Sequence, residues 1–185
     1  MNRSIISFII FSILLISAQQ AKSQKEEISG DVFYTEFGGA GVMMSFNFDS
    51  RFKRGERLGW GYRAGLGFSL GSLEWDYDNA TFNYDISEFE KRSFCTVPIG
   101  LNYIFGRKNS SNTFEIGGGA TFLSRKISIF YYEVAEAGHF IGHVNMMYRR
   151  VPINGGFLFR AGFTPIIGTS GEFMPMVAVA LGYAF

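Results

Sequence analysis

The chain ends on Val177-Ala178-Val179-Ala180-Leu181-Gly182-Tyr183-Ala184-Phe185, in which large apolar residues alternate with small ones. Successive side chains of a β-strand point to opposite faces. One face of this stretch would therefore be large and apolar, and the other would carry only Ala and Gly. The pattern predicts a strand with one face toward an apolar medium and the other toward a narrow interior.

The same alternation recurs along the chain. In residues 60–70 the even positions are apolar or aromatic, and the odd positions are Gly, Arg or Ser. Further stretches of this kind cover residues 42–49, 97–105, 114–122, 140–149 and 157–164. A soluble sheet would carry charged, solvated side chains on its second face, but here that face is mostly small. We therefore expect the apolar face to meet lipid and the small, polar face to line a narrow closed barrel.

The connections between these stretches alternate between short and long. Residues 51–57, 106–112 and 150–154 form short turns, and residues 74–92, 125–139 and 165–173 form longer connections. Outer-membrane barrels keep short turns in the periplasm and have an even number of strands. We predict an all-β fold, a closed antiparallel up-and-down transmembrane β-barrel of about eight strands. An even count requires that residues 31–37 and 42–49 form two strands, joined by a turn at 38–41. The alternative, one long strand over residues 32–49, would give an odd number of strands, and the barrel would not close.

The N-terminus has the form of a secretory signal peptide. Arg3 precedes an apolar run over residues 5–16, and small residues then lead into a polar segment. The apolar run is short for a membrane-spanning helix, although an uncleaved anchor helix is the alternative. We predict cleavage after Ala18, with Ala21 as the second choice. The expected organisation is a signal peptide at 1–18, a short periplasmic segment at 19–30 and a barrel at 31–185.

The composition of the chain fits a membrane barrel and argues against nucleic-acid binding. The 17 Lys and Arg residues nearly balance 16 Asp and Glu residues, and a nucleic-acid partner requires a basic face. The 21 Phe and 9 Tyr residues can form aromatic belts at the membrane interfaces. Cys95 is the only cysteine, which excludes an internal disulfide, and we expect it to pack on a strand.

Several of these stretches resemble the strands of a known family. Residues 41–49, 61–68, 97–106, 114–120 and 159–165 resemble strand signatures of small outer-membrane β-barrel proteins of Gram-negative bacteria. The terminal strand with Tyr183 and Phe185 resembles the assembly signal of such barrels. The resemblance implies export through the secretory pathway, the cell outer membrane as location, contact with its lipid, and recognition by the barrel-assembly machinery. Many family members have no assigned activity, and we predict no enzymatic activity, cofactor or metal.

Polar side chains fall on the predicted inner face of the barrel. They form an expected lumen network of Glu36, Arg63, Asn102, Glu115, His143 and Arg160. Buried charges are costly unless they are paired, so we expect Glu115 to pair with Arg63 or Arg160. We interpret the network as an interior plug in a side-chain-filled lumen. The predicted role is structural or interactive, through extracellular loops, and a small-solute channel is the alternative.

Charged residues near the predicted turns are interpreted differently. Arg149 falls on the inner face by alternation. It also lies beside a turn, however, and with Arg107, Lys108 and Arg150 it is expected to be a solvated cap.

Two further groups of residues suggest other functions. His139 and His143 could join Ser124 or Ser128 and Glu133 or Glu136 in a lipid acyl hydrolase, but no motif fixes such a triad. We instead interpret His139 as a loop residue and His143 as a hydrogen-bonding residue of the lumen. The acidic and aromatic loop 74–90 could bind Ca²⁺ or a basic partner, but it lacks EF-hand spacing. We therefore expect a solvated loop, and the sequence names no ligand for it.

Overall fold

The structure is a computed structural model that describes residues 30–69, 75–76, 81–82, 93–127, 138–169 and 171–185. The barrel wall consists of β1 (Val32–Gly38), β2 (Met44–Arg51), β3 (Gly59–Ser69), β6 (Phe94–Gly106), β7 (Asn112–Ile127), β8 (Gly138–Arg150), β9 (Gly156–Phe163), β10 (Ile166–Ile167), β11 (Phe173–Met174) and β12 (Val177–Ala184). A 3₁₀ turn, η1 (Gly39–Gly41), connects β1 to β2. The short strands β4 (Trp75–Asp76) and β5 (Thr81–Phe82) pair with each other in a separate sheet.

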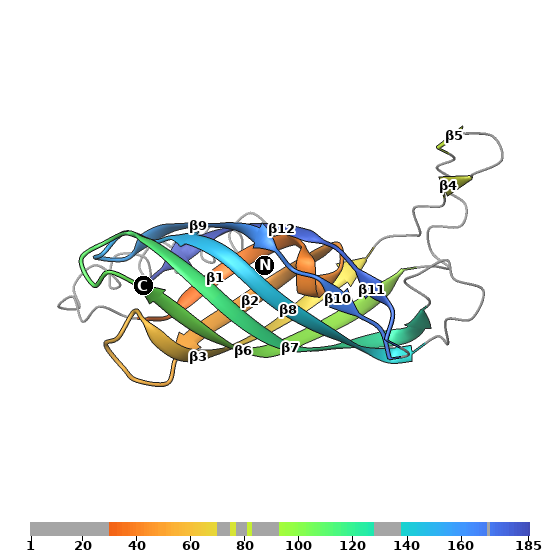
Figure 1. Cartoon of the computed structure of the whole chain (residues 1–185), viewed down its shortest axis with the longest axis horizontal. Helices are drawn as coiled ribbons and strands as arrows, with labels where there is room; N and C mark the ends of the chain where they lie inside the picture. The colour runs from red at the N-terminus through yellow and green to blue at the C-terminus, as the bar shows by residue number, and fades with distance from the viewer. Residues whose placement is uncertain (1–29, 70–74, 77–80, 83–92, 128–137, 170) are drawn as a thin grey trace, which may run out of the picture.

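The wall closes on itself as an antiparallel barrel (Figure 1). β10 continues β9 and β11 continues β12, so the ten paired segments make eight wall strands. Each strand pairs with the next, and β12 pairs with β1 from Val32↔Ala184 to Gly38↔Ala178. The predicted closed barrel of eight strands is therefore confirmed. Residues 32–51 form a hairpin, as the even count required.

The two ends of the barrel differ in their connections. The turn end carries the short connections 52–58, 107–111 and 151–155, together with the start of β1 and the terminal Phe185. The opposite end, called the loop end, carries η1 and the connections that leave β3, β7 and β10. The predicted signal peptide and most of segment 19–30 lie outside the described residues. Among the residues that are described, no helix is long and apolar enough to cross a membrane.

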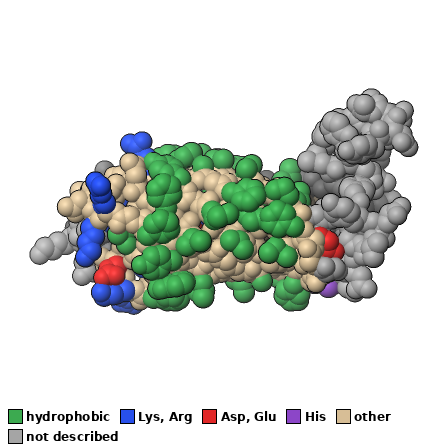
Figure 2. Space-filling model, viewed as in Figure 1, with side chains coloured by type: hydrophobic (Ala, Val, Ile, Leu, Met, Phe, Trp, Pro, Cys, Tyr) green, Lys and Arg blue, Asp and Glu red, His purple; other side chains and the backbone are tan. Residues whose placement is uncertain are grey.

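The outer surface of the wall is apolar over most of its length (Figure 2). Large side chains on this surface are widely exposed, for example Leu66 at 68% and Val177 at 71%. Soluble monomers rarely expose apolar patches of more than a few hundred Å². An apolar exterior around a polar interior is the arrangement that suits lipid hydrocarbon.

Aromatic rings gather on the outer surface near the turn end. Trp60 contacts Tyr103 with ring centroids 5.3 Å apart, and Phe114 contacts Tyr148 at 5.9 Å. We call the following set the aromatic belt: Phe52, Trp60, Tyr62, Tyr103, Phe105, Phe114 and Tyr148. Amphipathic and aromatic side chains favour the level of the lipid headgroups.

The predicted faces hold along the strands and fail at two neighbouring residues, Val42 and Met43. Ser45, Asn47 and Asp49 are buried, as the alternation requires. Met43, expected on the inner face, is 45% exposed, and Val42 instead packs against an interior apolar cluster. The reason is a backbone irregularity, because Val42 has a φ of 73° and β2 begins only at Met44. Period-two alternation does not extend through such a residue.

Candidate functional site: the filled lumen

Arg160 on β9 lies at the centre of the barrel interior and joins two carboxylates. Its Nε and Nη2 donate to the two carboxylate oxygens of Glu115 on β7, at 3.1 and 2.6 Å. Its Nη1 donates to Oε2 of Glu36 on β1 at 2.7 Å. The guanidinium also lies 4.8 Å from the ring centroid of Tyr34. All four side chains are almost completely buried, so the bidentate geometry compensates for the desolvation of the charges.

A second group of charges lies beside the first. Asp49 on β2 pairs with Arg51 two residues along the same strand and with Arg149 on β8. Arg149 also reaches Glu115 at 3.3 Å, so the two groups share one network across the lumen. Asn102 on β6 accepts from Arg51 at 2.7 Å and donates to Asp49 and Glu115, both at 3.3 Å. These contacts connect strands on opposite sides of the barrel.

Arg63 on β3 lies within the same interior but makes different contacts. Its Nη1 lies 3.6 Å from Oε2 of Glu36, and its side chain is completely buried. None of its guanidinium nitrogens has a hydrogen-bond partner among the residues that the structure describes. Glu36 is therefore shared by two arginines, with the short contact on Arg160.

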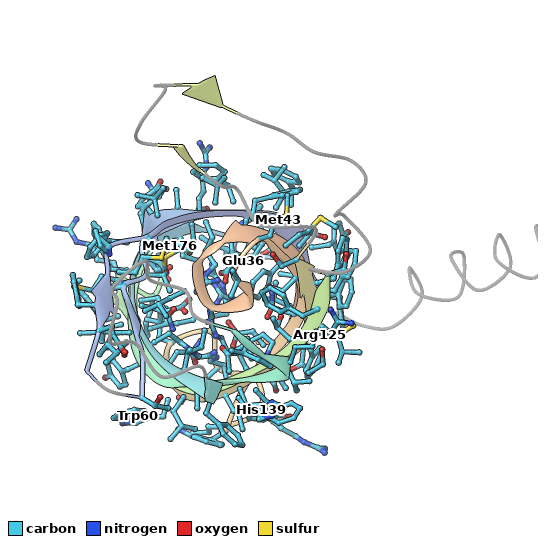
Figure 3. All side chains as sticks on the ribbon, turned by 90° about the vertical axis from the view of Figure 1, so that its right-hand side faces the viewer. Glu36, Met43, Trp60, Arg125, His139 and Met176 are labelled. Atoms are coloured by element: carbon cyan, nitrogen blue, oxygen red, sulfur yellow. The ribbon has the colours of Figure 1, made fainter. Side chains whose placement is uncertain are left out.

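The connection between β1 and β2 folds into the lumen and closes its loop end. Figure 3 looks into this end and shows the ribbon of η1 inside the ring of strands, with Glu36 beneath it. Ala40 is completely buried, and its carbonyl oxygen accepts a 2.8 Å hydrogen bond from Thr121 on β7. The carbonyl oxygen of Gly41 accepts from Thr96 on β6 at 3.2 Å. The sequence correctly placed a turn here but did not indicate that it enters the barrel.

Apolar side chains fill the rest of the lumen in two clusters. A cluster near the turn end comprises Val32, Tyr34, Val151, Leu158, Ala180 and Ala184. A second cluster near the loop end comprises Phe94, Leu123, Ile141 and Ile166, with Val42, Met174 and Met176 packed against it. The interior therefore combines charged, polar and apolar side chains, since buried polar residues such as Thr121 and His143 also lie beside the loop-end cluster. A narrow barrel can close its ends with apolar side chains because they need no partners.

The six residues of the expected lumen network are all buried, and the structure brings five of them into one set of contacts. Glu36, Arg63, Asn102, Glu115 and Arg160 lie in the charged layer described above. His143 lies nearer the loop end, where its Nδ1 is 3.3 Å from the hydroxyl of Thr121.

Sequence reasoning missed three charged members of the network. Asp49 was placed on the inner face without a role, Arg51 was assigned to a turn, and Arg149 was expected to be a solvated cap. The last expectation was wrong, because Arg149 is 4% exposed and pairs with Asp49 and Glu115. The alternation itself indicated that these three side chains point inward, because it continues through Asp49 and Arg51 on β2 and to Arg149 on β8. A position next to a turn does not imply solvation when the side chain can reach back along the lumen.

Those residues considered for a hydrolase that the structure describes make other contacts. His139 Nδ1 lies 2.9 Å from the carbonyl oxygen of Leu123, and its ring stacks on Phe122 at 6.0 Å. The hydroxyl of Ser124 accepts from the backbone N–H of Cys95 at 2.9 Å. Among the described residues, neither histidine is hydrogen-bonded to a serine or a carboxylate. Ser128, Glu133 and Glu136 lie outside the described residues, as does most of loop 74–90.

Metal ligands do not gather in the described part of the chain, where no group of three or more His, Cys, Asp or Glu residues could hold an ion. Cys95 lies on β6 and is exposed on the outer surface.

No family model and no curated protein matches the chain. Two solved structures of the outer-membrane protein Ail of Yersinia pestis are similar to it. The structure of Ail in a phospholipid bilayer nanodisc has 12% identity and a TM-score of 0.49, covering 84% of this chain and 99% of Ail. The structure of Ail with the heparin analogue sucrose octasulfate has 11% identity and a TM-score of 0.36, covering 83% and 93%. The closed wall, apolar exterior and filled interior described above give this chain the architecture of a small outer-membrane β-barrel protein.

Proposed function

We propose that the protein is an integral outer-membrane barrel that does not conduct solutes and serves as a stable scaffold for its extracellular connections. In this proposal the signal peptide at 1–18 is removed during export. The turn end faces the periplasm, and the connections that leave β3 and β7 face outward and carry the interactions. The apolar outer surface supports the membrane location, because it would be unfavourable in water.

The observation that carries the proposal is the closure of the lumen in successive layers. The ion pairs of Arg160 and Arg149 cross the middle of the barrel. The apolar cluster around Leu158 closes the turn end, and η1 with the cluster around Leu123 closes the loop end. An ion would have to displace buried side chains in each layer, so a continuous aqueous path is unfavourable.

We expect planar lipid bilayers that contain the purified protein to show no uniform unit conductance. Electrophoresis of the same reconstituted sample, with and without boiling, is the control, because a folded barrel shifts its mobility only after heating. Absence of current together with the heat-dependent shift would support the closed scaffold. A reproducible conductance step from the folded protein would favour the small-solute channel instead.

We also propose that Phe185 belongs to an assembly signal read by the barrel-assembly machinery. Phe185 is 57% exposed at the end of β12, and its N–H donates to the carbonyl oxygen of Asp31 at 3.1 Å. Deletion of Phe185 is expected to reduce the folded, outer-membrane fraction several-fold while export continues, as measured by heat-dependent mobility after cell fractionation.

Phe157→Ala is the matched control for that deletion. Phe157 is 60% exposed on β9 and lies directly opposite Tyr183 in the register of the two strands. It therefore has a similar lipid-facing environment without being at the chain terminus. If the Phe185 deletion and Phe157→Ala give the same folded outer-membrane fraction, the terminal position of Phe185 has no special role in assembly.

A further inference from the structure

Five exposed basic residues form a continuous arc at the turn end of the barrel, and we call Lys53, Arg54, Arg107, Lys108 and Arg150 the basic arc. They come from neighbouring parts of the wall. Gly59 pairs with Ile104, which places the β2–β3 turn beside the β6–β7 turn. Asn112 pairs with Arg150, which places the end of β8 beside the same turn. Figure 2 shows Lys and Arg side chains gathered at this end.

Most of the positive charge in the basic arc is uncompensated within the described part of the chain. Lys53 pairs with Glu56 at 2.5 Å, and both side chains are largely exposed. No described acidic residue forms an ion pair with Arg54, Arg107, Lys108 or Arg150. The remainder of the turn end is different, because the connection 151–155 contains no charged residue. Arg57 of the β2–β3 turn is only partly exposed and donates to the carbonyl oxygen of Val151 at 2.7 Å. Among the described residues, the exposed positive charge is therefore concentrated along the rim from β2 to β8.

The basic arc lies directly beside the aromatic belt. Trp60 belongs to the belt, and its carbonyl oxygen accepts from the N–H of Phe52 at 3.0 Å, next to Lys53. The ring of Trp60 lies outside the wall and contacts Tyr103, four residues before Arg107 (Figure 3). Aromatic belts mark the headgroup level of a bilayer. In the proposed membrane location, the guanidinium and ammonium groups of the basic arc lie at the height of lipid phosphates.

We propose that the basic arc binds the headgroups of anionic phospholipids in the leaflet that surrounds the turn end. A lipid is favoured over a soluble acidic partner because the cations border the exposed apolar surface of the wall. An anionic headgroup neutralises charges that the chain itself leaves unpaired, and its acyl chains pack against the aromatic belt. This inference rests on the proposed membrane location, and it adds the class of lipid and the residues that select it.

Quenching of Trp60 by brominated lipids tests the proposal at the site itself. The chain has two tryptophans, so Trp75→Phe leaves Trp60 as the only reporter. The folded protein is reconstituted in phosphatidylcholine that contains the same small fraction of brominated phosphatidylglycerol or brominated phosphatidylcholine. We expect stronger quenching by the anionic lipid, because each cation near the surface enriches it about fivefold. Added salt is expected to reduce the difference.

Two double variants in the same background locate the site. Arg107→Gln/Lys108→Gln removes two charges from the basic arc and is expected to reduce the excess quenching by the anionic lipid, although three cations of the arc remain. Arg125→Gln/Lys126→Gln removes the same charge from β7 toward the loop end and is expected to retain the preference. Heat-dependent mobility confirms that each variant is folded.

Three results would overturn the proposal. Equal quenching of Trp60 by both lipids, with the basic arc unsubstituted, would mean that the arc does not select anionic lipid. A soluble acidic partner would then be the remaining explanation for the arc. An undiminished preference in Arg107→Gln/Lys108→Gln would place the lipid elsewhere. Absence of quenching by either lipid would mean that Trp60 is not in a bilayer, and this result alone would also overturn the proposed membrane location.

Discussion

Arg160→Met is expected to lower the free energy of unfolding by about 3–5 kcal/mol, the usual cost of removing one partner from a buried ion pair. The substitution removes three hydrogen bonds and leaves Glu36 and Glu115 as buried carboxylates. Arg63 lies 3.6 Å from Glu36 and is no replacement for the bidentate contact with Glu115. Chemical unfolding of the barrel in lipid vesicles, followed by tryptophan fluorescence, measures the change.

Arg150→Met, compared in vesicles of zwitterionic lipid that offer the basic arc no anionic headgroup, is the matched control because Arg150 belongs to the neighbouring strand and is exposed. It is expected to change the free energy of unfolding by less than about 0.5 kcal/mol. The loss of unfolding free energy in Glu115→Gln/Arg160→Met should be smaller than the sum of the losses in the two single variants. The reason is that the double variant no longer buries the Glu115 charge without its partner. Equal effects of Arg160→Met and Arg150→Met would contradict the view that the lumen network stabilises the barrel.

Gly119→Ala is expected to destabilise the barrel by about 3 kcal/mol, at the upper end of the usual range for overpacking. A Cβ atom at Gly119 would overlap the carbonyl oxygen of Ile99 and lie 2.6 Å from Cα of Gly100. These are backbone atoms of the neighbouring strand β6, so they cannot move aside as a flexible side chain can. The same unfolding measurement in lipid vesicles would show the loss.

Gly118→Ala tests whether this effect comes from the close approach rather than from the loss of a glycine. A Cβ atom at Gly118 meets only the carbonyl oxygen of His143, at 3.2 Å. Both substitutions reduce the conformational entropy of the unfolded chain by the same amount, which favours folding by about 0.4–1 kcal/mol. Gly118→Ala should therefore be nearly neutral, and a loss as large as that of Gly119→Ala would exclude the steric explanation.

The sequence predicted the wall of the barrel because alternation is a local property. Each strand needs only its own residues to show which face is apolar, and Arg63, Glu115 and Arg160 were placed inward on that basis. The alternating lengths of the connections then gave the number of strands. Both predictions depend on backbone geometry that the side-chain pattern reports directly.

The contents of the lumen were harder to predict because they depend on distances across the barrel. Arg51 and Arg149 lie next to turns in sequence, yet their long side chains reach Asp49 in the interior. Local pattern also cannot show that η1 turns inward, since Gly38–Gly41 would suit an exposed hairpin turn equally well. The inward path is determined by partners on other strands, such as Thr121 and Thr96.

The inward position of η1 has a consequence for the order of folding. Its hydrogen bonds go to β6 and β7, and the N–H of Gly39 also donates to Sδ of Met176, just before β12. η1 thus obtains its long-range contacts only when much later strands are in place. Such long-range contacts are slow to form, since loop-closure entropy is lost before they contribute. Pairing of β1 with β12 and docking of η1 should therefore occur together, and partial barrels without the last strand should have an unanchored first hairpin.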